Sequence, residues 1–167
     1  MVSTLKIITL GDEALRQKAA PVKEIRPLYR EIAEQMINLM VEGGGVGLAG
    51  PQVGFMERIF VAKHAGEPPR IFINPSIIAT SEDRVKHEEG CLSLPGVWAD
   101  VIRPKTLTVQ AWNERGRPFT LEASGILGRI IQHECDHLNG ILFIDHLSEL
   151  KRKRIIMHYE KLRKRRR

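Results

Sequence analysis

Residues 133–137 read His-Glu-Cys-Asp-His, and this pattern restricts the fold more than any other part of the chain. Two histidines four residues apart lie about 40° apart around a helix axis, so both imidazoles can bind one metal ion if the segment is helical. Glu134 then lies beside the ligands, where it can reach a water molecule without binding the metal itself. A metal site needs a third protein ligand, which the fold must bring to this helix. The alternative is a charged surface helix that matches the pattern by chance.

Two classes of zinc protease suggest a third ligand downstream. A histidine six residues after His137 is excluded because Phe143 occupies that position, although Gly140 of the extended motif is present. A thermolysin-type acidic ligand would have to be Glu149 or Glu160, and neither has a supporting sequence context. A small metallopeptidase is therefore a weakly supported alternative.

A better candidate, Cys91, lies upstream in the segment 88–96 (EEGCLSLPG). It follows a glycine and precedes an apolar alternation that ends at Pro95, which suggests a strand edge facing a cleft. Taken alone, Cys91 would be interpreted as a buried structural thiol. The helix with two histidines and no third ligand favours coordination instead. Other possible ligands, without a flanking pattern, are His64, His87, His146 and His158.

The pattern of apolar residues predicts an α+β fold. Helical spacing covers 25–40 and about 124–140, and Ser148 can cap a last helix with an apolar stripe at Leu150, Ile155, Tyr159 and Leu162. Strands are predicted at 58–63, 70–78, 105–112 and 118–122, whereas 43–54 is too rich in glycine for a regular element. We expect mainly antiparallel β-sheets packed around a central HExxH helix, with N-terminal and C-terminal helices.

The length of 167 residues fits one domain. We expect a catalytic domain over 1–150 and a basic helical tail of the same domain over 151–167. Two cysteines do not make a disulfide framework, which favours a reducing compartment. The N-terminus lacks a signal or transit pattern, and no apolar run reaches membrane-span length. These features predict a cytoplasmic protein without a membrane partner.

Residues 45–50 match the dinucleotide pattern G-x-G-x-x-G, but a helix precedes them instead of the strand that the pattern requires. The glycines are better explained by a backbone that approaches a bound chain closely. Gln52 could then offer its amide to a reacting carbonyl.

Three segments, taken together and in order, resemble the motifs of the peptide deformylase family. They are Gly45–Gln52 (GVGLAGPQ), Glu89–Ser93 (EGCLS) and Gln132–His137 (QHECDH). The resemblance covers roughly residues 5–150. It implies removal of the formyl group from the N-terminal formylmethionine of nascent polypeptides, with release of formate.

Carried onto this sequence, the resemblance implies a metal bound by Cys91, His133 and His137. It implies Fe²⁺ as the native ion, with Zn²⁺, Ni²⁺ or Co²⁺ able to occupy the site. Glu134 would act as general base and then general acid. The Gln52 amide and the Leu92 backbone N–H would stabilise the oxyanion. Substrate contacts are expected from Gly45, Val46, Gly47, Glu89, Trp98 and Ile130.

The chain departs from the family pattern at three positions. Gly50 replaces an alanine and is expected to loosen the loop beside Gln52. Trp98 stands where many members carry an arginine, and we expect it to pack on the peptide. Arg129 stands where many relatives are apolar.

The tail 151–167 contains ten Lys/Arg and one acid, a net charge of +9, whereas the other 150 residues carry −3. Such a segment can be a solvated helix end, or it can dock on a phosphate backbone. The family resemblance implies docking on the ribosome near the exit of the nascent chain. A structural-metal RNA-binding module is an alternative for the whole chain.

Overall fold

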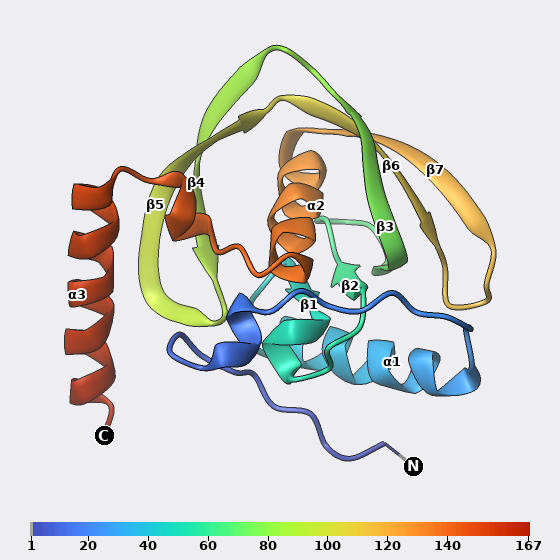
Figure 1. The fold of residues 1–167 in the computed structure, drawn as a ribbon, viewed down its shortest axis with the longest axis horizontal. Coiled ribbons are helices and arrows are strands. Elements are labelled where there is room, and N and C mark those ends of the chain that lie inside the picture. The colour runs from blue at the N-terminus through green and yellow to red at the C-terminus, as the bar shows by residue number, and fades with distance from the viewer. Residues whose placement is uncertain (1) are drawn as a thin grey trace.

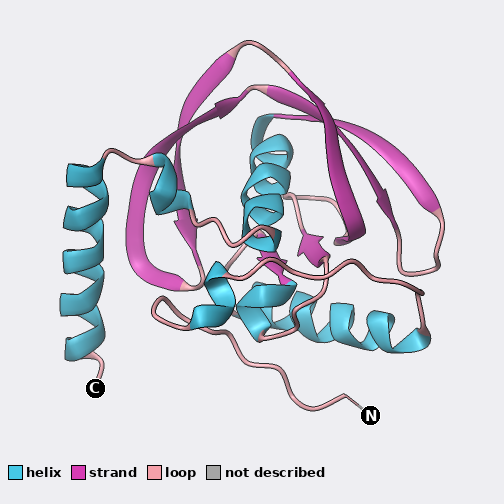
Figure 2. Ribbon diagram, in the orientation of Figure 1, coloured by secondary structure: helices cyan, strands magenta, loops and turns pink. Residues whose placement is uncertain are grey.

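The computed structural model describes residues 2–167, which fold around one central helix (Figures 1 and 2). The helices are α1 (Pro27–Glu42), α2 (Gly125–Leu138) and α3 (Glu149–Arg165), with short 3₁₀ turns η1 (Glu13–Arg16), η2 (Gly50–Val53) and η3 (Phe143–His146). The strands are β1 (Gly47–Ala49), β2 (Ile59–Ala62), β3 (Arg70–Thr80), β4 (Arg84–Cys91), β5 (Leu94–Pro104), β6 (Thr106–Trp112) and β7 (Pro118–Ser124). The predicted α+β fold is confirmed.

Two antiparallel sheets surround α2. One sheet has the order β1-β2-β3-β6-β7, and the other is the hairpin β4-β5. Figure 1 shows α2 between them, with β4 and β5 on one side, β3, β6 and β7 on the other, and α1 below. The three C-terminal strands β5, β6 and β7 follow one another with short connections, so the hairpin and the large sheet are joined directly through residues 104–106.

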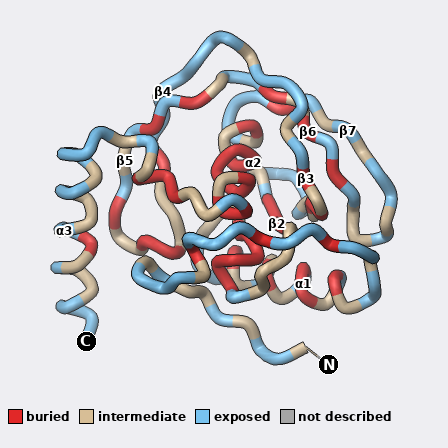
Figure 3. The backbone as a smooth tube through the Cα atoms, viewed as in Figure 1, coloured by how far each residue is buried: buried red, intermediate tan, exposed pale blue. Residues whose placement is uncertain are grey.

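Helix α2 is buried along most of its length (Figure 3). Ile130, Ile131 and Leu138 belong to a cluster that includes the stacked rings of Phe60 and Phe72, whose centroids lie 4.4 Å apart. A helix buried on several sides is normally apolar all round. This one also buries Gln132, His133, Glu134 and His137. Buried polar groups need partners or a function, which directs attention to this helix.

Helix α3 packs against β5, with Tyr159 2% exposed and Ile155 and Leu162 partly buried. The predicted cap is confirmed, since the Ser148 hydroxyl accepts a hydrogen bond from the Lys151 backbone N–H at 3.3 Å. Leu150 does not belong to the packed face, because it is 61% exposed. No helix within residues 2–167 has the length and apolarity needed to cross a bilayer.

The prediction that 43–54 forms no regular element was wrong. Residues 47–49 form β1, which pairs with β2 through Gly47↔Ala62 and Ala49↔Phe60, and residues 50–53 form η2. Pairing with a neighbouring strand outweighs the low strand propensity of glycine. The expected loosening at Gly50 stays a prediction, although the turn is tightly packed there. A Cβ there would meet the backbone oxygens of Phe55 and Glu57, so a larger residue would not fit this buried turn.

Gly140 lies just after α2, and its replacement tests how strongly backbone packing fixes the end of this helix. It has φ +74°, and a Cβ would lie 2.5 Å from the Arg16 carbonyl oxygen. Gly116 has a similar φ of +76° with nothing within 4 Å of its Cβ position. Left-handed backbone alone costs a non-glycine residue about 1–2 kcal/mol. We therefore expect Gly116→Ala to lower the free energy of unfolding by about 1–2 kcal/mol and Gly140→Ala to lower it by clearly more.

The measurement is urea unfolding of both variants beside the wild type. Equal losses of unfolding free energy in the two variants would show that the close approach of Gly140 to the Arg16 carbonyl does not affect stability.

Candidate metal centre and active site

Cys91, His133 and His137 form a metal-binding site between β4 and α2. Their candidate ligand atoms all lie within 4.8 Å of one another. The His137 Nε2 atom is 3.3 Å from Cys91 Sγ and 3.2 Å from His133 Nε2. Tetrahedral coordination with bonds of about 2.0–2.3 Å separates the donor atoms by about 3.3–3.7 Å. The three residues therefore fit one ion, and the third ligand comes from 46 positions before His137 along the chain.

The turn between β4 and β5 places Cys91 at this point. The strand register shifts between Gly90 and Cys91, after which Cys91 pairs with Leu94 across the tight turn. A Cβ at Gly90 would lie 2.5 Å from the indole Nε1 of Trp98, its cross-strand partner. The glycine thus lets the indole lie against the backbone directly before the thiol.

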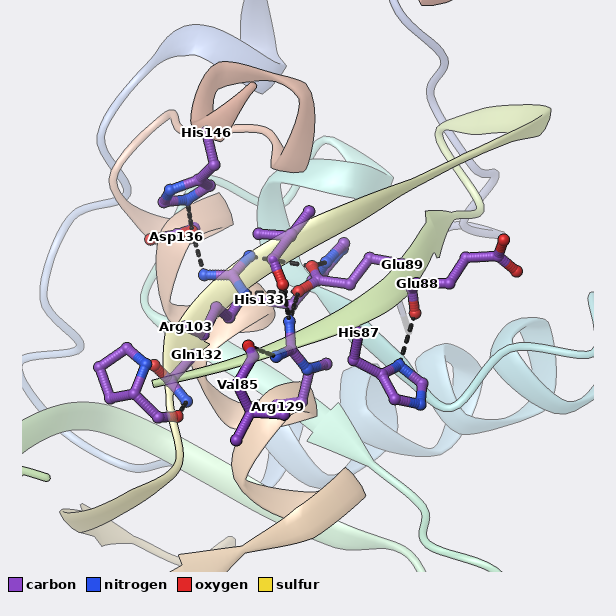
Figure 4. A network of polar contacts seen from close by, with 12 residues as sticks. Val85, His87, Glu88, Glu89, Arg103, Arg129, Gln132, His133, Asp136 and His146 are labelled. Carbon is purple, nitrogen blue, oxygen red and sulfur yellow. Dashed lines mark hydrogen bonds and ion pairs between the residues drawn. The ribbon is translucent and has the colours of Figure 1, made fainter. Parts of the chain in front are cut away.

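Glu89 holds the ring of His133 in place (Figure 4). Its Oε1 atom is 2.9 Å from His133 Nδ1. An ionised carboxylate can only accept, so Nδ1 carries the proton and Nε2 is free for the metal. Burial alone would raise the pKa of Glu89. Hydrogen bonds and charges from His133 and Arg103 outweigh burial and hold that pKa well below its usual range.

Two arginines complete the partners of Glu89. Arg103 donates from Nε at 2.6 Å and from Nη2 at 2.9 Å, and Arg129 donates from Nη1 at 2.6 Å. Arg103 also donates to Asp136 at 2.9 Å, and His146 Nε2 lies 2.7 Å from the same carboxylate. Sequence reasoning did not find Arg103. A signal existed, because Val97, Val101 and Arg103 share the inward-facing phase of β5, and an inward arginine requires a carboxylate partner.

Glu134 lies beside the ligands on α2 and is 3% exposed. Its Oε2 atom is buried without a hydrogen-bond partner among the described residues. Burial, the largest cause, raises the pKa of Glu134 to about 7. A Cβ at Gly47 would overlap the Glu134 carboxylate, so β1 can approach this group only as glycine. An unpartnered buried carboxylate beside a metal site is suited to proton transfer.

Gln52 is 1% exposed and has a fixed orientation. Its Oε1 accepts from the Ala49 backbone N–H at 3.0 Å. Its Nε2 then donates to Ser93 Oγ at 3.1 Å and lies 3.4 Å from Cys91 Sγ. The amide N–H₂ is therefore directed toward the ligand cluster.

The site opens into a cavity of about 410 Å³. The sequence-predicted residues that line it are Gly45, Val46, Gly47, Gln52, Glu89, Cys91, Leu92, Trp98, Ile130, His133 and Glu134. Val46 and Trp98 are exposed and, with Ile126, give the cavity an apolar rim. Glu89 lines the cavity, but both of its carboxylate oxygens are already bound by protein groups. They differ in this from the oxygens of a carboxylate that is free to bind a substrate.

The raised pKa of Glu134 predicts a pH-dependent stability of the metal-free protein. The pKa rises from 4.5 to about 7 on folding, so ionisation at higher pH disfavours the folded state. Metal-free Glu134→Gln should be more stable than metal-free wild type above pH 7, by up to about 3 kcal/mol. The difference should fade as the pH falls toward 4.5. Urea unfolding in a chelator at several pH values measures it, and a difference independent of pH would contradict this explanation.

Comparison with known proteins agrees with this site. The family model for polypeptide deformylase matches residues 4–153. The peptide deformylase of Brucella suis is 44% identical over 165 residues, which cover 96% of this chain and 94% of the relative. The crystal structure of a peptide deformylase from Legionella pneumophila aligns with a TM-score of 0.92 and 36% identity, over 98% of each chain. That of the Synechococcus elongatus peptide deformylase with actinonin aligns with a TM-score of 0.86 and 41% identity, over 91% of this chain and 85% of the other.

The match extends over nearly the whole chain in sequence and in fold, and it includes the segments that carry the three metal ligands and Glu134. The chain therefore belongs to the peptide deformylase family, the metal-dependent hydrolases that remove the formyl group from the N-terminal methionine of nascent polypeptides.

Proposed function

We propose that the cavity between β4 and α2 performs this deformylation with the residues in the following roles. The observation that carries the proposal is the buried Glu134 carboxylate, whose Oε2 atom has no partner among residues 2–167, beside Cys91, His133 and His137 and the directed amide of Gln52. A divalent ion held by Cys91, His133 and His137 supplies Lewis acidity and makes water more acidic.

Glu134 moves the proton. It accepts a proton from the attacking water as the water oxygen forms its bond to the formyl carbon. It then delivers the proton to the peptide nitrogen as the carbon–nitrogen bond breaks, which yields formate and a free amino terminus. Glu134 is 3% exposed and its Oε2 atom has no hydrogen-bond partner among the described residues, which supports both halves of this role because that oxygen is free to take and release a proton.

Gln52 and Leu92 stabilise the formyl oxygen as charge builds on it. The Gln52 amide is held by Ala49 and Ser93, so it requires little reorganisation during the reaction. The Leu92 backbone N–H lies in the segment directly after Cys91 on the cavity wall. Loss of one such donor typically raises the barrier by about 3 kcal/mol.

The remaining cavity residues hold the peptide. Gly47 and Gly45 offer backbone groups, and Val46 and Ile130 line the pocket for the first side chain. Trp98, 58% exposed at the rim, supports the following residues of the peptide. We propose that Glu89 positions His133 and does not contact the substrate, because its carboxylate oxygens are already bound by His133 and Arg103.

We propose Fe²⁺ as the native ion, with Zn²⁺, Ni²⁺ or Co²⁺ as substitutes. One thiolate and two imidazoles suit both iron and zinc, so the donor set supports this list without ranking it. The ranking follows from the family resemblance. Metal analysis of protein purified without oxygen would identify the ion.

Replacement of Glu134 tests the mechanism. We expect Glu134→Ala to lower kcat/KM for formate release from a formyl-Met peptide by 10²-fold or more, because proton transfer is lost. Its metal content should stay near that of the wild type, since Glu134 is not a ligand. Activity that survives this change would contradict the mechanism. Cleavage of internal peptide bonds by the wild type would instead favour a metallopeptidase.

The tail 151–167 is proposed to belong to the same domain as 1–150 and to dock on ribosomal RNA or protein near the nascent-chain exit. The packing of Tyr159 against side chains of residues 1–150 supports the assignment of the tail to the same domain. The docking is supported by the exposed basic side chains of α3, which include Lys153, Arg154, Lys161 and Lys164. A ribosomal partner implies a cytoplasmic location.

Charge removal on α3 tests this docking. We expect replacement of Lys153, Arg154, Lys161 and Lys164 by Gln to weaken ribosome binding at least tenfold and to reduce its salt dependence. Formate release from a free peptide should be unchanged. The matched control removes four exposed lysines elsewhere, namely Lys18, Lys23, Lys63 and Lys105. Sedimentation with ribosomes measures binding, and equal behaviour of the two variants would exclude specific docking through α3.

A further inference from the structure

The metal site joins two parts of the fold that do not share a sheet. The hairpin β4-β5 pairs only with itself among the described strands and carries Cys91. Helix α2 carries His133 and His137. The separation of the thiol from the two imidazoles therefore depends on the contacts between hairpin and helix.

Arg129, in the first turns of α2, makes three such contacts (Figure 4). Its Nη1 donates to Glu89 Oε2 at 2.6 Å and to the Val101 carbonyl at 2.9 Å. Its Nη2 donates to the Val85 carbonyl at 2.7 Å. Val85 and Glu89 lie on β4 and Val101 lies on β5, so one guanidinium binds both strands to the helix. The side chain is 11% exposed.

Arg103 contacts the same carboxylate, but it belongs to the hairpin and not to α2. It lies on β5 and donates to Glu89 within its own hairpin. Its link to α2 runs through Asp136 near the far end of that helix. Arg129 instead links the N-terminal part of α2 to the hairpin. The two arginines therefore hold the hairpin near both ends of α2, with Glu89 between them.

We propose that Arg129 is a positioning residue that sets the geometry of the metal site. It fixes the hairpin, and with it Cys91, relative to the two histidines. It also fixes Oε2 of Glu89, whose other oxygen orients His133. This role deepens the proposed function, and it concerns metal retention as well as turnover. Partners of this kind typically change metal affinity by 10–100-fold when they are removed.

The test measures release of Co²⁺ from the loaded protein to an excess of a chelating dye. We expect Arg129→Met to speed release about tenfold or more and to shift the visible absorption of the Co²⁺-loaded protein. Arg129→Lys keeps the charge but has a single nitrogen in place of the planar fork. It should retain the contact with Glu89 and release metal at an intermediate rate.

Arg58→Met is the matched control. Arg58 is a half-buried arginine that donates to the Leu138 carbonyl and to Asn139 Oδ1, both at 3.1 Å, and so binds the C-terminal end of α2 without touching Glu89. Its loss should lower the melting temperature but leave metal release and the absorption spectrum unchanged.

Equal acceleration of release in Arg58→Met and Arg129→Met would overturn the proposal, since general destabilisation would then explain both. Release from Arg129→Met at the wild-type rate would overturn it as well. Metal release does not require deformylation. If the loaded wild type gave no formate while Arg129→Met still released metal faster, the proposed function would fail and this inference would stand.

Discussion

The buried hydrogen bond between Glu89 and His133 is the interaction on which the rest of the site depends. It joins the hairpin to α2, fixes which nitrogen of His133 faces the metal, and places a negative charge inside the protein. A buried charge is tolerated only when it is paired, and removal of one partner typically costs about 3–5 kcal/mol. Arg103 and Arg129 supply that pairing. The metal site is therefore held by a network of ion pairs and hydrogen bonds that extends through Asp136 to His146 at the surface.

The fold serves this network by enclosing α2. The large sheet covers the apolar side of the helix, and α1 packs on β1 and β2 of that sheet. The hairpin covers the polar side and brings both Glu89 and Cys91 from one strand. Close packing at glycines then sets the distances. Gly47 lets β1 approach Glu134, and Gly90 lets the Trp98 indole lie against the backbone directly before Cys91. The Glu134 carboxylate stays buried, and its Oε2 atom has no partner among the described residues, which leaves this oxygen available to take a proton.

The sequence predicted the parts of this arrangement that have local signals. The helical spacing of His133 and His137 and the strand-like context of Cys91 identified the three ligands, and all three lie together. The central helix and most strands of the large sheet were also predicted, because the spacing of their apolar residues is a local signal. Arg103 was missed because its partner lies on the neighbouring strand, and strand pairing is not a local property. The strand β1 was missed because pairing with β2 overrides the propensity of its glycine-rich sequence.

The central claim is that one thiolate and two imidazoles hold the catalytic ion while Glu134 stays free of it. X-ray absorption at the metal edge, recorded on anaerobically purified enzyme, tests this most directly. We expect one sulfur at about 2.3 Å and two imidazole nitrogens at about 2.0–2.1 Å from the ion, with the sulfur lost in Cys91→Ser. A first shell of nitrogen and oxygen alone in the wild type would contradict it, because Cys91 would then not be a ligand.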